Sequence, residues 1–199
     1  MGRFIKIIGA AVAVVLASGA AEAHTFGLHG AGFEHGFGHP FGGLDHLLAM
    51  VTVGLWAAQR GGRAVWLVPA TFMAAMVFGG LLGLEGIALP MVELGIAASL
   101  MVLGSVVAFS FQPPLWVGMS MVAAFAIFHG HAHGAEMPEA ASPVLYAVGF
   151  LLATGLLHSI GVSACLLARR KEVFATFADR AIRSAGAVVA ASGVLFAFL

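Results

Sequence analysis

Long apolar segments separated by short polar breaks are the feature that most constrains what this chain can fold into. Of its 199 residues, 61% are hydrophobic and only 9% are charged, which lies outside the range of ordinary soluble domains. A run of about 20 apolar residues crosses a bilayer as a helix, because a helix satisfies its own backbone N–H and C=O groups where water is absent. The sequence therefore predicts an all-α integral membrane protein.

Residues 1–23 have the pattern of a cleaved N-terminal signal peptide. A positively charged start leads into an apolar run, and small residues follow as far as Ala23, an order typical of secretory signals. Cleavage there would leave residues 24–199 as a single transmembrane domain that begins at His24 outside the cytoplasm. An uncleaved anchor is the alternative, for which the apolar run is short.

Six further apolar segments predict six transmembrane helices. They lie at about residues 40–58, 64–84, 91–109, 115–129, 144–168 and 185–199. Positive charge gathers in the loop with Arg60 and Arg63 and in a loop that includes Arg169, Arg180 and Arg183. Because positively charged loops stay in the cytoplasm, we expect a multi-pass protein of the cell inner membrane with both mature termini outside the cytoplasm.

Charge and cysteine content exclude two further classes. The formal net charge is zero with nine histidines taken as neutral, so no basic surplus exists to bind nucleic acid. The only cysteine, Cys165, lies in an apolar segment, so no internal disulfide forms and helix packing must hold the fold together. The pattern Gly79-x-x-x-Gly83 suits close approach of two such helices.

The first polar cluster stands at the start of the first mature helix. Residues 24–40 are rich in Gly, His and Phe without helical periodicity and predict an irregular lead-in, and Pro40 suits the first helical position. His39, Asp45 and His46 would then lie at the helix mouth. Ionisable groups in hydrocarbon are costly and usually mark an ion pathway, and the helix dipole keeps Asp45 ionised as a ligand or as the partner of a ligating imidazole.

The second polar cluster ends the fourth predicted helix. If this stretch is helical, His129, His133 and Glu136 share one face and His131 lies opposite; a partly unwound end is the alternative, because two glycines interrupt it. The predicted topology places both clusters at the same membrane face, where they would line one entrance.

Imidazole and carboxylate together indicate the class of ion. They suit nickel, cobalt, zinc or copper, whereas calcium and magnesium prefer shells made only of oxygen. Glu93 and His24 are further candidate ligands on the same side. His158 lies deeper and is either a later station on an ion path or a hydrogen-bonded structural residue.

Two motifs resemble signatures of the HupE/UreJ proteins, which are membrane permeases associated with nickel or cobalt supply to hydrogenases and ureases. One motif is His39-Pro-x-x-Gly-x-Asp45-His46-x-x-Ala-Met50 and the other is Phe128-His-Gly-x-Ala-His-Gly-x-Glu136. The resemblance extends over the whole chain and implies uptake of nickel or cobalt. The matching motif positions are His39, Asp45, His46, His129, His133 and Glu136.

The expected function is secondary transport of nickel or cobalt ions, with no enzymatic activity and no prosthetic group. No G-x-x-x-x-G-K-[ST] loop for nucleotide binding is present, so the membrane potential would drive uptake. A cytoplasmic metallochaperone or maturation protein would receive the ion. Two alternatives stay open: a membrane-embedded metallohydrolase with Asp45 or Glu136 as base, and a metal-capture protein that does not transport.

Overall fold

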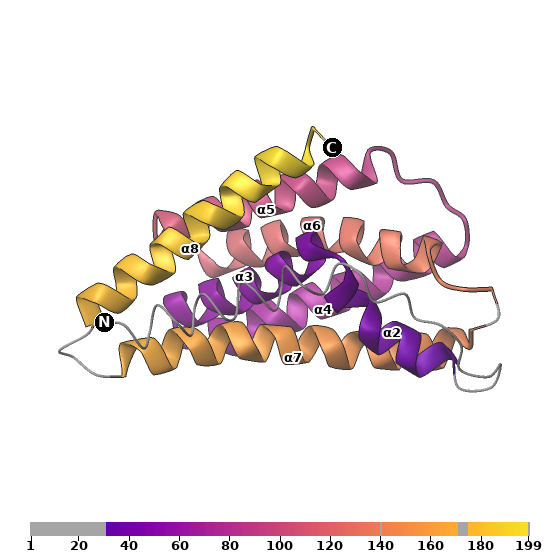
Figure 1. Cartoon of the computed structure of the whole chain (residues 1–199), viewed down its shortest axis with the longest axis horizontal. Helices are drawn as coiled ribbons and strands as arrows, with labels where there is room; N and C mark the ends of the chain where they lie inside the picture. The colour runs from indigo at the N-terminus through magenta and orange to yellow at the C-terminus, as the bar shows by residue number, and fades with distance from the viewer. Residues whose placement is uncertain (1–30, 140, 171–174, 199) are drawn as a thin grey trace.

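The computed structural model describes residues 31–139, 141–170 and 175–198, where it contains seven helices and no strands. The predicted all-α class is therefore confirmed for these residues, while the predicted signal peptide and His24 lie outside them. Figure 1 shows the long helices running side by side, with α7 along one edge. The helices are α2 Ala31–Gly42, α3 Leu44–Arg60, α4 Ala64–Leu84, α5 Val92–Ala108, α6 Leu115–Ala135, α7 Pro143–Arg169 and α8 Ala175–Phe196.

Helix α3 is the centre of the bundle. It packs against α2, α4, α5, α7 and α8, and the most extensive remaining pairs are α4 with α6, α5 with α8 and α2 with α7. The core contains the fully buried side chains of Met50, Trp56, Phe72 and Met76. His46, in the first turn of α3, is thus buried among neighbouring helices.

Glycines bring α4 and α6 into backbone contact. A Cβ added at Gly79 or Gly83 of α4 would stand less than 3.0 Å from a carbonyl oxygen of α6, and one added at Gly130 or Gly134 of α6 would meet a carbonyl oxygen of α4 as closely. Small residues permit such an approach between membrane helices, where dispersion contacts replace the hydrophobic effect as the source of association. The prediction that the pattern Gly79-x-x-x-Gly83 permits close approach of two helices is confirmed.

The predicted irregular lead-in over residues 24–40 is wrong from Ala31 onward, and so is the predicted helix start at Pro40. Pro40 lies inside α2. The chain then bends by 82° at Gly43, whose backbone is extended, and α3 begins at Leu44.

Tertiary packing explains why α2 is helical despite its glycines. Gly36 lies against the backbone of Tyr146 on α7 with no room for a Cβ. On another side of α2, Phe33, Phe37 and Phe41 recur every four residues, and successive ring centroids are 6.0 and 5.7 Å apart. These contacts compensate for the low helix propensity of glycine. The recurrence of phenylalanine every four residues is a helical pattern that the sequence-based prediction missed.

The start of α8 and the end of α6 differ from the predicted helix boundaries. Helix α8 begins at Ala175 rather than at residue 185, so Arg180 and Arg183 lie on a helix and not in a loop. Arg183 Nε donates to the carbonyl oxygen of Ala108 at the C-terminus of α5 (2.7 Å), where the helix dipole favours a cation. Helix α6 continues to Ala135, so the helical alternative for the second cluster is correct.

Length and composition identify α4, α6 and α7 as candidate membrane spans, and α2 with α3 as a fourth if the bent pair crosses as one. Helix α5 is apolar but has only 17 residues. Among the described residues, apolar helices therefore support a multi-pass membrane protein, with three or four spans by this measure.

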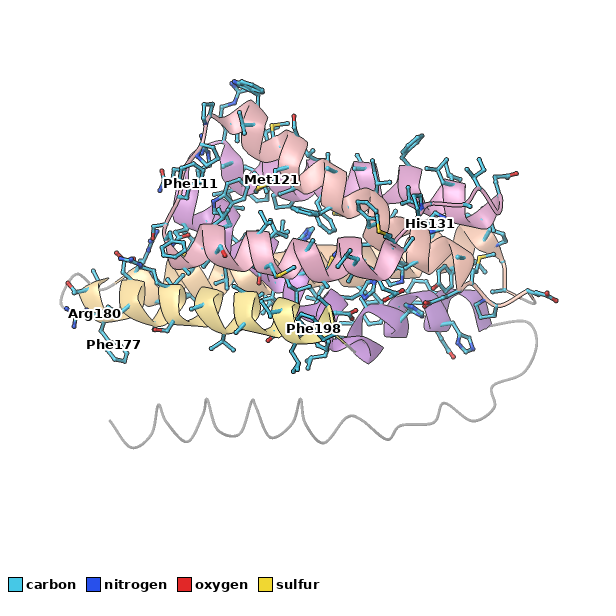
Figure 2. The ribbon with its side chains drawn as sticks, turned by 90° about the horizontal axis from the view of Figure 1, so that it is seen from above. Phe111, Met121, His131, Phe177, Arg180 and Phe198 are labelled. Carbon is cyan, nitrogen blue, oxygen red and sulfur yellow. The ribbon has the colours of Figure 1, made fainter. Side chains whose placement is uncertain are left out.

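Charges separate to the two ends of the bundle. In Figure 2, Arg180 and Phe111 lie at one end and His131 at the opposite end. Exposed aromatic side chains, Trp66, Trp116 and Phe109, accompany the arginine end, as is typical of a membrane–water interface. The described arginines, all at that end, are Arg60, Arg63, Arg169, Arg170, Arg180 and Arg183. The carboxylates at the other end are Glu34, Asp45, Glu85, Glu93, Glu136 and Glu139, while Asp179 lies among the arginines.

Candidate metal site

Three buried imidazoles from two helices meet near the bend between α2 and α3. His46 comes from the first turn of α3, and His129 and His133 lie one turn apart on α6. The ring centroid of His46 is 4.7 Å from that of His129 and 4.4 Å from that of His133. Their relative exposures are 9%, 0% and 2%. The two clusters that the sequence placed at one membrane face are thus in contact.

A carboxylate sets the orientation of His46. Asp45 Oδ1 lies 2.9 Å from His46 Nδ1 and also accepts the backbone N–H of His46 at 2.7 Å. An ionised carboxylate only accepts, so Nδ1 carries the proton and the Nε2 lone pair is left free. His46 Nε2 is buried and has no partner among the described residues. A carboxylate behind one ring nitrogen is the arrangement that orients metal-binding histidines.

Glycine at position 43 makes this contact feasible. A Cβ there would stand 2.8 Å from Asp45 Oδ1 and 3.2 Å from His46 Nδ1. Gly43 has a φ of −98°, which any residue can adopt. Glycine is needed at this position because a larger residue would not fit, and not because the backbone is unusual. The contact between Asp45 and His46 therefore depends on a small residue at the bend after α2.

A hydroxyl sets the orientation of His129. Ser99 on α5 donates its only hydroxyl hydrogen to the carbonyl oxygen of Ile96 (2.6 Å), so its oxygen accepts from His129 Nε2–H (2.8 Å). The Nδ1 lone pair of His129 is left free, buried and without a partner among the described residues. Sequence reasoning missed Ser99, because a serine in an apolar helix resembles any small packing residue.

His133 and the rim complete the cluster. Both ring nitrogens of His133 are buried and without hydrogen-bond partners in the part of the chain that the structure describes. The His133 ring packs on Phe150 of α7 at a centroid distance of 4.0 Å and on His39 at 4.6 Å. His39 Nε2 lies 3.2 Å from a carboxylate oxygen of Glu136, which is more than half exposed. This pair forms the solvent side of the site.

The donor atoms do not yet converge on one point. Within the described ranges, no three or more side chains of His, Cys, Asp or Glu are arranged so that they could hold one metal ion. The rings of His46 and His129 meet in a T-shaped arrangement. Coordination of one ion by three of these side chains therefore requires them to move from the positions described here.

Other candidate residues lie apart from the three imidazoles. Glu93 is exposed in the first turn of α5. His131 points away from the cluster, and its Nε2 lies 2.8 Å from the carbonyl oxygen of Ile87. His158 is buried deeper, where the Phe72 ring packs between it and His129 at centroid distances of 5.3 and 5.9 Å.

The chemistry of the cluster is that of neutral nitrogen donors in an apolar enclosure. Buried polar atoms are normally hydrogen-bonded, so several imidazole nitrogens without partners at one place indicate a site that can bind a ligand. Imidazole donors suit borderline divalent transition metals. The nearby carboxylates of Asp45 and Glu136 provide the negative charge that a divalent cation requires.

Comparison with known proteins shows the family of the chain. Residues 12–196 match the family described as HupE / UreJ protein. Protein HupE from Rhizobium leguminosarum bv. viciae is 46% identical over 189 residues, which cover 94% of this chain and 98% of that protein. No solved structure matches the chain. With one family matched from residue 12 to residue 196 and a relative aligned over nearly its full length, the chain belongs to the HupE/UreJ family.

Proposed function

We propose that this protein is a secondary permease that carries nickel or cobalt ions inward across the cell inner membrane for metalloenzymes such as hydrogenase or urease. Membership of the HupE/UreJ family supports the transporter class. The observation that carries the proposal concerns two imidazoles. In His46 and in His129, one ring nitrogen donates a hydrogen bond, so the lone pair of the other nitrogen is free to bind a metal ion: Nε2 in His46 and Nδ1 in His129.

The transport path begins at the carboxylate-rich end. Clustered negative charge raises the local concentration of cations, so a hydrated divalent ion gathers there and meets His39 and Glu136 first. It then exchanges part of its water shell for the nitrogens of His46, His129 and His133. Glu93 and His24 are proposed as additional ligands during capture. Binding must stay weak enough for release toward the cytoplasm, where a metallochaperone or maturation protein receives the ion.

The membrane potential supplies the driving force. An inside-negative potential of 100 mV contributes about 2.3 kcal/mol per charge, hence about 4.6 kcal/mol for a divalent cation. This energy corresponds to roughly a thousandfold accumulation at equilibrium. The permease therefore needs no nucleotide hydrolysis and no prosthetic group.

Flux into sealed vesicles tests the function directly. Proteoliposomes containing the purified protein should accumulate nickel or cobalt above the outside concentration when the interior is negative. When the potential is collapsed, entry should stop at equal concentrations, because only the potential drives accumulation beyond that point. Tight binding without flux would instead identify a metal-capture protein. Metal-dependent cleavage of a lipid or peptide without flux would identify a hydrolase.

The proposed topology has six spans after removal of residues 1–23, with the arginine end in the cytoplasm. In a Cys165→Ala background, a membrane-impermeant maleimide added from outside should label Glu139→Cys but not Gln112→Cys. Both positions are exposed, Glu139 at the carboxylate end and Gln112 at the arginine end. Labelling of Gln112→Cys alone would reverse the proposed orientation.

A further inference from the structure

Thr154 and His158 are two of the three buried polar side chains on α7 that have no hydrogen-bond partner among the described residues; the third is Tyr146. Thr154 Oγ1 and both ring nitrogens of His158 are all unpaired, and the relative exposures of the residues are 0% and 2%. They lie four residues apart, one turn along the same face of the helix. Neither belongs to the histidine cluster described above.

The hydroxyl of Thr154 differs from those of Thr52 and Ser99, the other buried serine and threonine side chains of the described residues, because it has no hydrogen bond. Hydroxyls in helices commonly donate to a carbonyl three or four residues earlier. Such bonds are made here by Thr52, Ser99, Ser105, Ser159 and Ser192. A threonine that only filled space would gain by the same bond, since a buried polar group without a partner destabilises the fold. The absence of that bond points to a role outside packing.

The same observation bears on the two interpretations of His158. A structural histidine would be held by hydrogen bonds, and neither nitrogen has one within the described ranges. The ring of Phe72 packs against it in a T-shaped arrangement. The missing hydrogen bonds favour the interpretation of His158 as a later position on an ion path.

The pair lies on the inward side of the histidine cluster. Phe150, one turn before Thr154, packs against His133, and His158 follows Phe150 by eight residues, which is about 12 Å along the helix axis. The direction is toward the arginine end, because α7 ends at Arg169. His158 also lines a groove of about 380 Å³ between α4 and α7, which is open to the outside of the bundle.

We propose that Thr154 and His158 form a second station for the transported divalent cation, in which an imidazole nitrogen and a hydroxyl oxygen bind an ion that retains part of its water shell. This inference rests on the proposed transport function. Two neutral protein donors hold a cation less firmly than the outer imidazoles with their carboxylates, and a weak inner station permits release. The Phe72 ring separates the two stations.

Initial uptake rates test the second station. Thr154→Val and His158→Leu should each lower nickel or cobalt uptake at least about tenfold, while equilibrium nickel binding at the outer cluster of the purified protein stays within about twofold. The matched control is Thr52→Val, because Thr52 is equally buried but its hydroxyl is bonded to Leu48. This variant should transport normally. Melting temperatures of the Thr154 and His158 variants should be unchanged or higher, because each substitution removes an unpaired buried group.

A spectroscopic test shows whether the ion reaches the pair. In a Cys165→Ala background, the protein with Thr154→Cys and bound cobalt should show a thiolate-to-cobalt charge-transfer absorption that His158→Leu abolishes. Ser192→Cys on α8 is the control and should show none. Absence of the band in Thr154→Cys, together with normal uptake by Thr154→Val and His158→Leu, overturns the second station.

The outcomes separate this inference from the proposed function. If the unsubstituted protein transports metal and both α7 variants transport it equally well, only the second station is wrong. If the unsubstituted protein moves no metal, both proposals are wrong. Selective loss of uptake with retained outer binding supports both.

Discussion

Replacing His46 by alanine should lower the initial rate of nickel or cobalt uptake by at least about 100-fold at equal membrane abundance. His46 is the residue that contacts both His129 and His133, and its Nε2 lone pair is the one that Asp45 holds in a fixed orientation. The substitution removes a donor and also leaves Asp45 without its imidazole partner. Radiolabelled metal uptake by whole cells measures the effect.

Two companion variants show whether the loss arises from coordination. Asp45→Asn keeps the shape but removes the negative charge, and it should reduce uptake about 10- to 100-fold, as expected for a partner that orients a ligand. His131→Ala lies on the same helix as His129 and His133, but its ring bonds to Ile87 away from the cluster, so it should leave uptake unchanged. Normal uptake by His46→Ala would contradict the proposed site.

Substituting alanine at Gly79 should destabilise the protein by about 1–3 kcal/mol or more, whereas alanine at the adjacent Gly80 should be neutral or stabilising. A Cβ at Gly79 would stand less than 3.0 Å from the backbone of Ile127, which cannot move without displacing α6. A Cβ at Gly80 meets only the carbonyl oxygen of Gly130, at 3.5 Å. The contact at Gly80 is an ordinary van der Waals distance, so the higher helix propensity of alanine decides whether Gly80→Ala stabilises or destabilises the protein.

Thermal unfolding of the purified variants in detergent measures this difference. Because α6 carries His129 and His133, Gly79→Ala should also weaken metal binding, while Gly80→Ala should not. Equal melting temperatures for the two variants would mean that the α4–α6 contact is not as close as the structure shows. The adjacent positions share one helix, one residue type and one substitution, so local propensity cannot explain a difference.

Much of the fold follows from local pattern. The predicted segment 64–84 has the same bounds as α4, and those at 91–109 and 144–168 differ from α5 and α7 by one residue at each end. Hydropathy is a property of each segment alone, so it needs no knowledge of the partners. The prediction that residues 31–40 are irregular was wrong because their helical structure depends on a partner: the glycines of α2 are stabilised in a helix by packing against α7.

The sequence predicted which residues belong to the candidate site, but not how their side chains contact one another. His39, Asp45, His46, His129, His133 and Glu136 were selected from their type and spacing, and the structure brings them to one end of the bundle. Their role as metal ligands stays a prediction. Ser99 could not be foreseen, because its importance depends on α5 packing against α6.

The sequence by itself determined that this is an all-helical membrane chain with two clusters of imidazole and carboxylate and a chemistry suited to borderline divalent ions. These properties follow from side-chain polarity and from the short periods of a helix. Only the tertiary structure decided the bend at Gly43, the contact of His46 with His129 and His133, and which ring nitrogens stay free. Those features depend on long-range contacts, since the partners of each imidazole come from helices distant in sequence whose separation is set by packing.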